Sequence, residues 1–487
     1  MSFSRALLHH FFLAGLAVLS ALLLLWFTAT VDYPVLWIEA IVLLFLGGVP
    51  ILWEWRKGKF DVFNVKNAFV LYYCLQFGAY TIYLLVVGGD HHIGSVSQSY
   101  DSLRVALLYA ICGLFVFQVG YYSRIGTTLG ALVPPWQLRI SYGKYLIVLF
   151  GLVATGVVAF VLLAYSQGGL AFLVTHIDEI RTQKLWGLGP FFYGLNLISI
   201  AFLLSYAVAL VHGYTRWLPA VLFFLSLFVS FAGAFRHMMF YTVAYALVLR
   251  HYLRAPFQTR RLALIAIVVL LTNALYVTYR VGRPQELTDA PSEIAHVFEQ
   301  KGYTRATMDA LFPRFHGTGS LARVVEKVPA VGHQWGKYFV TDLLFFPVPR
   351  ALWPEKPVSS GIQFNRLFYN DIIPRDETSA IVPTLLGELY WMFGLPGILA
   401  GTCLFGASCR ALYCYMVANR SLASVVLYSV GFWGLVLANE TLSLHSAMSL
   451  MTLLTVIGLL RAVSVSQRRP AFSALPAVIL TGRGKSQ

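Results

Sequence analysis

Apolar runs alternate with short polar gaps along almost the whole chain, from Ala6 to Ala462. Most runs are about twenty residues long, the length that crosses a bilayer as an α-helix, and a helix satisfies its own backbone hydrogen bonds in lipid. The pattern predicts about twelve spans, at roughly 6–29, 35–53, 67–87, 105–122, 145–166, 191–211, 217–235, 238–253, 262–279, 384–409, 422–438 and 447–463. The expected fold is therefore an all-α polytopic membrane protein.

The first run, from Ala6 to Thr30, follows Arg5, and a basic residue before an apolar run is also a feature of signal peptides. It is long enough to span a membrane and lacks a clear small-x-small cleavage site. We expect it to be retained as the first membrane helix.

The polar gaps predict the orientation of the helices. Basic residues collect in alternate gaps: Arg56, Lys57, Lys59 and Lys66; Arg124, Arg139 and Lys144; Arg250, Arg254, Arg260 and Arg261; Arg410 and Arg420; and Arg461, Arg468 and Arg469. The other short gaps carry few basic residues. Because cytoplasmic loops of membrane proteins are enriched in lysine and arginine, the basic gaps and both termini are expected to be cytoplasmic.

One gap is far longer than the others and is expected on the outer face, between helices 9 and 10. It divides the chain into residues 1–279 with nine spans, residues 280–383 as a large periplasmic loop, and residues 384–487 with three spans and a basic tail. Loops of this length are usually functional or disordered, and its many aromatic residues argue against disorder. We expect short helices lying over the mouth of a helix bundle.

Composition agrees with a membrane protein, since 58% of residues are hydrophobic, 12% are charged and the mean hydropathy is +0.70. The net charge of +15 follows from the basic gaps, so it does not indicate nucleic-acid binding.

Five cysteines lie in or beside apolar runs and indicate neither a disulfide framework nor a zinc site. Phosphate-binding, zinc-protease and serine-hydrolase motifs are missing, so an ATP-driven pump is disfavoured and no metal or cofactor is expected.

Several cations of the long loop lie in apolar surroundings, where they are candidates for binding an anionic substrate. The predicted substrate-binding residues of this loop are Arg280, Arg283, Arg314, Arg350, Lys356 and Arg366, with His316 as a candidate general base. Arginine binds phosphate through paired, charge-assisted hydrogen bonds, which suits a lipid-linked pyrophosphate. The alternative is that these cations pair with loop carboxylates or extend to lipid headgroups.

Five further residues lie at the expected outer ends of spans. Arg236 and His237 interrupt an apolar stretch and are predicted to bind substrate, although a simple polar turn is the alternative. Glu388 follows the long loop just below the outer surface and is a candidate general base or a structural partner of an arginine. Glu440 and His445 are expected to be solvated loop residues.

The run PRALWPEKP (Pro349 to Pro357), the segment GIQFN (Gly361 to Asn365) and GELYWMFGLPG (Gly387 to Gly397) resemble the Wzy-type polysaccharide repeat-unit polymerases. The Gly-x-x-Arg sequence at Gly233 to Arg236 fits the same family, and so does the layout of many spans with a late periplasmic loop. The first half of the chain matches only in hydropathy.

The resemblance implies a C-type membrane glycosyltransferase architecture and a metal-independent glycosyltransferase of the bacterial inner membrane. Such an enzyme joins undecaprenyl-pyrophosphate-linked repeat units into a long O-antigen, capsule or exopolysaccharide, and a chain-length regulator and a flippase are possible partners. The family's functional arginines map onto Arg236, Arg314, Arg350 and Arg366. The alternatives are an O-antigen ligase, which would use the same donor, and a lipid-linked oligosaccharide transporter.

Overall fold

The computed structural model describes residues 33–87, 99–166, 168–170, 189–213, 217–232, 236–258, 261–262, 264–265, 315–345, 348, 352–370 and 382–465. Within these residues the secondary structure is helical and no strand occurs. The chain forms two compact units, of which the first comprises Met1–Leu129, Ile267–Ala411 and Gly434–Met448. The second comprises Gly130–Ala266, Leu412–Trp433 and Ser449–Gln487.

Seven described helices are long and apolar enough to cross a membrane: Pro34–Arg56, Val65–Val86, Tyr100–Tyr122, Tyr142–Ser166, Tyr193–His212, Leu385–Asn419 and Leu442–Val463. These helices confirm an all-α membrane protein. A helix also lies at every other expected span except those at 6–29 and 262–279, which fall wholly or almost wholly outside the described residues. The full number of spans stays a prediction.

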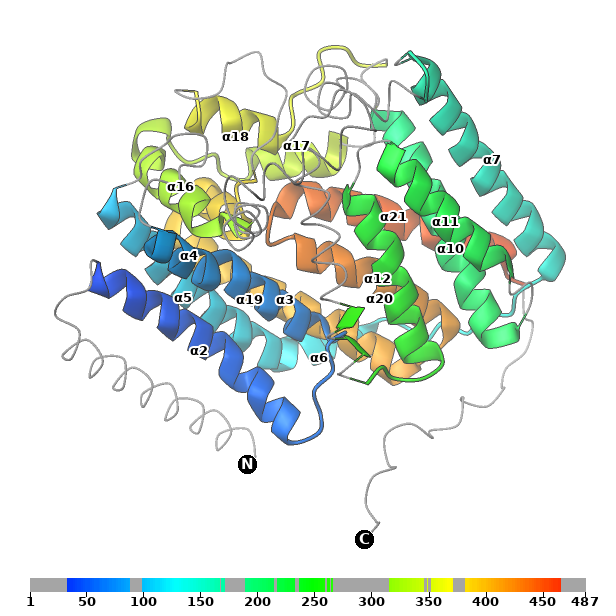
Figure 1. Cartoon of the computed structure of the whole chain (residues 1–487), viewed down its shortest axis with the longest axis horizontal. Coiled ribbons are helices and arrows are strands. Elements are labelled where there is room, and N and C mark those ends of the chain that lie inside the picture. Colours follow the sequence, from blue (N-terminus) through cyan, green and yellow to red (C-terminus); the bar gives the residue numbers. More distant parts are fainter. Residues whose placement is uncertain are drawn as a thin grey trace, which may run out of the picture. The chain divides into compact units, whose positions relative to one another are not determined.

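In the first unit, long helices run side by side and short helices gather at one end of them (Figure 1). The long helices are α2 (Pro34–Arg56), α5 (Tyr100–Tyr122) and α19 (Leu385–Asn419). A further span is formed by three consecutive elements, α3 (Val65–Tyr73), the π-helix η1 (Cys74–Ala79) and α4 (Tyr80–Val87). Helix α6 (Arg124–Leu132) follows α5 at the opposite end from the short helices.

The short helices are α16 (Gly317–Val331), α17 (Lys337–Phe345) and α18 (Ser360–Phe368), and all three come from the predicted large loop. They share a mainly aromatic core in which Phe364 and Phe368 of α18 pack on Trp391 of α19. Val324 and Val328 of α16 complete this core. Burial of these large side chains explains why the loop folds into helices instead of remaining solvated.

Helix α19 is broken near its start, where Gly394 adopts a φ of 66°. Pro396 lacks the N–H group that would continue the helical ladder at this point. The N–H groups of Gln334 and Trp335 donate to the carbonyls of Trp391 and Met392 at 3.1 and 3.0 Å. The turn after α16 thus satisfies the backbone at the break and fixes the short first segment of α19.

The second unit contains α7 (Tyr142–Ser166), α10 (Gly189–His212), α11 (Trp217–Ala232) and α12 (Arg236–Leu253). It also contains most of α20 (Leu422–Leu437) and of α21 (Leu442–Val463). Three buried hydroxyl groups join α10, α11 and α12, since Ser226 lies 2.8 Å from Ser199 and 2.7 Å from Thr242. Hydroxyl pairs of this kind hold helices together where the surroundings are apolar.

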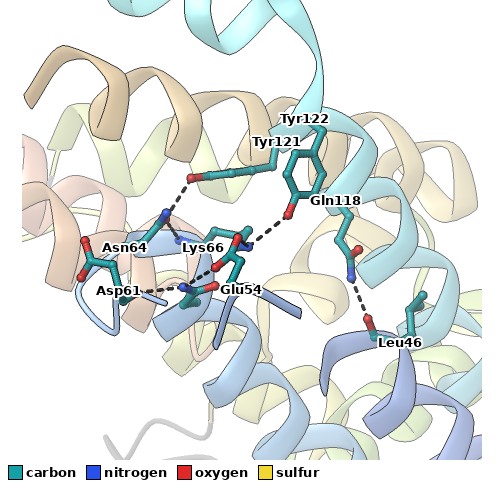
Figure 2. Close-up of polar contacts among 9 residues, drawn as sticks. Leu46, Glu54, Asp61, Asn64, Lys66, Gln118, Tyr121 and Tyr122 are labelled. Atoms are coloured by element: carbon teal, nitrogen blue, oxygen red, sulfur yellow. Dashed lines mark hydrogen bonds and ion pairs between the residues drawn. The ribbon is translucent and has the colours of Figure 1, made fainter. Parts of the chain in front are cut away.

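Lys66, one of the basic residues assigned to a cytoplasmic gap, is buried in the first unit at 1% exposure. Figure 2 shows its ammonium group between the Glu54 carboxylate and the Tyr122 hydroxyl, which lies 3.1 Å away. Asn67 donates to the second oxygen of Glu54 at 2.9 Å. The sequence pattern missed this pairing because Glu54 lies on the preceding helix.

Candidate functional site

The turn between α20 and α21, residues 438–443, organises the polar end of the first unit. Its carbonyl groups at Glu440 and Asn439 accept hydrogen bonds from the N–H groups of Thr384 and Leu385 at 2.8 and 3.1 Å. Thr384 is fully buried and adopts a φ of 69°, which is strained for a β-branched residue. The backbone strain at Thr384 is the energetic cost of fixing the start of α19 to this turn. Strained residues of this kind cluster at functional sites.

Glu388 lies in the first helical turn of α19 and is only 2% exposed. Its side chain contacts the turn formed by residues 438–443. Its Oε2 accepts from the Ser443 N–H group and its Oε1 from the Ser443 hydroxyl, both at 2.8 Å. The Ser360 hydroxyl of α18 lies 2.7 Å from that of Ser443 and 3.4 Å from Glu388. Among the described residues Glu388 pairs with these serines and with no arginine. Its geometry is that of an anchor joining α18, α19 and α21.

Asp342 of α17 extends this network, because the Ser360 N–H group donates to both of its carboxylate oxygens at 3.2 Å. Burial raises the pKa of Asp342, although hydrogen bonds from Ser360 and Ser443 and the charge of Lys356 act in the opposite direction. Lys356, predicted to bind substrate, donates to the Val348 carbonyl at 2.9 Å and attracts Asp342. These contacts join Lys356 to the loop segments, and its role in substrate binding stays a prediction.

The Glu440 side chain projects from the same turn. Its electrostatic partners are three aromatic side chains with polar groups, those of Tyr72, His445 and His316. The Tyr72 hydroxyl of α3 donates to its Oε1, and His445 Nε2 of α21 lies 3.8 Å from its Oε2. Burial raises the pKa of Glu440, but the hydrogen bonds and charges of His445, Tyr72 and His316 outweigh burial and leave the pKa below its usual range. Glu440 is therefore a carboxylate at neutral pH, with 32% of its side chain exposed.

The interpretation of Glu440 and His445 as solvated loop residues is wrong for His445, which lies in α21 and is 7% exposed. The physical reason is that α21 begins at Leu442, before the apolar run that marked the expected span. Glu440 remains partly exposed, as expected for a loop residue, but its carboxylate is paired.

His316 reaches this group because α16 begins against the π-helix η1. The Thr318 hydroxyl donates to the Phe77 carbonyl of η1 at 2.9 Å and lies 2.9 Å from the Thr81 hydroxyl. A Cβ atom at Gly317 would lie 2.4 Å from Gln76 Cγ, so only glycine permits the approach. Phe315 packs edge-on against Tyr72 at 5.7 Å between ring centroids. The segment carrying His316 is thereby held beside Glu440.

The other predicted substrate-binding residues are placed as follows. Arg236 and His237 begin α12 in the second unit, and their side chains lie outside the described part of the chain. Arg366 lies on α18, and its Nε has no hydrogen-bond partner among the described residues. Arg280, Arg283, Arg314 and Arg350 lie outside the described residues. Their roles stay predictions.

Sequence reasoning missed Tyr72, Asp342, Ser360, Thr384 and Ser443. Tyrosine and serine are ordinary residues of apolar helices, so neither pattern nor composition singles them out. Asp342 was visible as the one carboxyl group in the apolar run VTDLLFF and could have been noted. The described residues contain no group of three or more histidine, cysteine or acidic side chains that could hold a metal ion.

The arrangement brings together groups that can move and hold a proton. A partly exposed carboxylate, Glu440, lies beside the His445 imidazole and the Tyr72 phenol, and a buried carboxyl network fixes the turn that carries it. An imidazole paired with a carboxylate is a common general base, because the carboxylate stabilises the imidazolium that forms.

The sequence profile of a protein family described as a domain of unknown function (DUF8712) matches residues 168–437, more than half of the chain. No curated protein sequence and no solved structure matches the chain.

Proposed function

We propose that this chain, which belongs to the DUF8712 family, polymerises undecaprenyl-pyrophosphate-linked oligosaccharide repeat units into a long surface polysaccharide. The proposed enzyme is a metal-independent glycosyltransferase of the bacterial inner membrane, with about twelve spans and a C-type architecture. Its site faces the periplasm, on the side of α16, α17 and α18.

The observation that supports this proposal most is the meeting of two sequence-predicted candidate bases at one short turn. Glu388 bonds to Ser443, and Phe315, the neighbour of His316, packs on Tyr72, whose hydroxyl donates to Glu440. A polar centre at the end of apolar helices suits a substrate whose lipid tail lies in the bilayer and whose sugars extend from it.

The two candidates take different roles in the proposed reaction. Glycosyl transfer from a pyrophosphate requires removal of a proton from the attacking hydroxyl and stabilisation of the leaving diphosphate. His316, which precedes α16, takes the proton, and Glu388, which is buried and hydrogen-bonded to Ser443, positions the turn. Arg314, Arg350 and Arg366 of the first unit are the proposed cations for the diphosphate, and the role of Arg236 stays a prediction from the family resemblance.

The proposal is tested by gene deletion and complementation in the source organism. The deletion strain receives the wild-type gene, the His316→Ala variant, or the His212→Ala variant as a matched control, because His212 is exposed at the end of α10. Immunoblots establish equal membrane levels, and the surface polysaccharide is separated on a gel. We expect the wild type and His212→Ala to restore a long-chain ladder, and His316→Ala to leave a single capped repeat unit.

Other outcomes would identify other functions. A ladder that survives deletion of the gene would overturn the polymerase proposal. Free polymer that accumulates while every lipid-A-linked band disappears would indicate a ligase. Repeat units that accumulate on the cytoplasmic face of the membrane would indicate a transporter.

A further inference from the structure

The helix α17, which lies with α16 and α18 at one end of the long helices (Figure 1), has a polar group on its inner face. With about 3.6 residues per turn, residues four apart share one face of a helix. Asp342 is buried and accepts the Ser360 N–H group of α18 at 3.2 Å. Tyr338, four residues earlier, stacks on Trp391 of α19 at 4.8 Å between ring centroids. These two contacts fix which face of α17 is turned toward α18 and α19.

The opposite face of α17 carries large apolar side chains. Val340 and Leu344, four residues apart, are 51% and 60% exposed. Trp335, two residues before the helix, and Leu352, which follows it, are exposed further still. In a water-soluble protein the apolar stripe of a helix faces the core and the polar side chains face the solvent. The inverted arrangement of α17 indicates that the surroundings of its exposed face are apolar.

This exposed face is joined to the lipid-facing surface of α19. The Trp335 ring meets the Phe393 ring edge-on, with 6.2 Å between the centroids. Phe393, Leu395 and Leu399 are exposed apolar residues of a helix that is long and apolar enough to cross the membrane. Exposed apolar side chains of such a helix contact the hydrocarbon of the bilayer. The contact of Trp335 with Phe393 therefore makes lipid the occupant that fits the face of α17.

The residues at the start of this face are typical of the boundary between lipid and water. Tryptophan is enriched at the level of the headgroups, and Trp335 is held in an exposed position. Its φ of 48° is strained for a bulky residue, and its N–H group donates to the Met392 carbonyl at 3.0 Å. Lys337, also exposed, has an apolar stem that can lie along lipid while its ammonium group stays in water.

We propose that Trp335, Val340, Leu344 and Leu352 form a membrane-docking surface. Helix α17 lies in the headgroup region of the leaflet on its own side of the membrane, with these side chains directed toward the acyl chains. The inference does not depend on the proposed function, since it concerns the contact of the loop helices with lipid.

The docking surface also sets the position of the polar turn relative to the bilayer. Asp342, on the inner face of α17, is hydrogen-bonded to Ser360 of α18. The Ser360 hydroxyl in turn lies 2.7 Å from that of Ser443, at the end of the turn formed by residues 438–443. A helix fixed in the headgroup region therefore holds this turn near the level of the headgroups.

The test places a photoreactive side chain on the docking surface of the full-length protein. In separate proteins, p-benzoylphenylalanine replaces Val340, Leu344 or, as the matched control, Glu326, an exposed and charged residue of α16. Each protein is reconstituted in nanodiscs of phosphatidylethanolamine and phosphatidylglycerol, irradiated, and analysed as intact protein by mass spectrometry. A thermal-unfolding midpoint equal to that of the wild type shows that each variant is folded.

We expect adducts with the mass of one phospholipid at Val340 and Leu344, at least about fivefold more abundant than at Glu326. The reason is that an interfacial helix buries its apolar face about 5–10 Å into the boundary between headgroups and acyl chains. The benzophenone groups at Val340 and Leu344 would then lie beside C–H bonds of lipid, whereas the one at Glu326 would lie in water.

The contrary results are separate from those of the polysaccharide assay. Folded variants that give no lipid adduct at Val340 or Leu344 would place this face in water and overturn the inference. A crosslink to a peptide of the same chain, or a product with the mass of two chains, would show that protein covers the face and would overturn it equally. Equal lipid adducts at all three positions would reflect random encounter with lipid and would also overturn it.

Discussion

At the scale of single residues, Lys66 and Glu54 form a buried ion pair in the first unit. Lys66 is 1% exposed, whereas the side chain of Glu54 keeps 25% of its surface exposed. Both members have further partners, Tyr122 for the ammonium group and Asn67 for the carboxylate. Removal of one partner leaves a charge in an apolar environment, which costs more than the pair itself contributes.

We predict that Lys66→Met lowers the free energy of unfolding by about 3 kcal/mol, because Glu54 loses its counter-ion. The measurement is the midpoint of thermal unfolding of the purified protein in detergent. Lys59→Met is the matched control, since Lys59 is exposed. The double variant Lys66→Met/Glu54→Gln should recover part of the loss, and a Lys66→Met protein as stable as Lys59→Met would contradict the importance of the pair.

The site residues show what sequence can and cannot reveal at this scale. Glu388 and His316 stand out because ionisable groups are rare beside apolar runs, and Glu388 lies hydrogen-bonded to the turn at Ser443. The roles of Ser443 and Tyr72 could not be predicted, because their contacts join helices distant in the chain. The pairing of Lys66 with Glu54 could not be predicted for the same reason.

At the scale of elements, α5 and α19 pack with their backbones in contact. A Cβ atom at Gly120 would lie 2.0 Å from the Cys403 carbonyl oxygen, and one at Gly406 would lie 2.2 Å from the Phe117 carbonyl oxygen. Small residues permit such close approach between membrane helices. Because the obstructing atoms belong to backbone, they cannot move aside as a flexible side chain could.

We predict that Gly406→Ala forces α19 away from α5 and destabilises the protein by roughly 1–3 kcal/mol, the usual cost of overpacking. Gly151→Ala is the matched control, because Gly151 lies within α7 and no atom lies within 4 Å of its added Cβ. That control should be neutral or stabilise by up to about 1 kcal/mol, since alanine favours a helix. Thermal unfolding in detergent measures both, and equal midpoints would argue against the close packing.

Hydropathy predicted most of the elements themselves, because an apolar run of span length has few alternatives to a helix in lipid. The helix breaks were not predicted. The segment FGLPG contains Gly394 and Pro396, which permit the kink in α19, but glycine and proline are common in membrane helices and do not mark a break alone. The π-helix η1 accepts a hydrogen bond from Thr318 of α16 at the Phe77 carbonyl, a contact that no sequence pattern marks.

At the scale of the whole molecule, the division into two compact units could not be read from the sequence. Helices α19, α20 and α21 each contribute residues to both units, so the boundaries cross continuous apolar runs. Charge is more informative at this scale. In the first unit, the basic residues after α2 lie at the opposite end of the long helices from α16, α17 and α18 (Figure 1).

This opposition predicts that the two ends of the first unit face different sides of the membrane. Lys337 at the start of α17 and Lys59 after α2 are both exposed, so Lys337→Cys and Lys59→Cys form a matched pair. A membrane-impermeant maleimide applied to cells with a permeabilised outer membrane should label Lys337→Cys. Lys59→Cys should be labelled only after the inner membrane is broken, because loops rich in lysine and arginine remain in the cytoplasm. The wild type is the blank for its own thiols. Labelling of Lys59→Cys in intact inner membranes would reverse the orientation and move the site to the cytoplasmic face, where a polymerase of exported glycans would not meet its substrate.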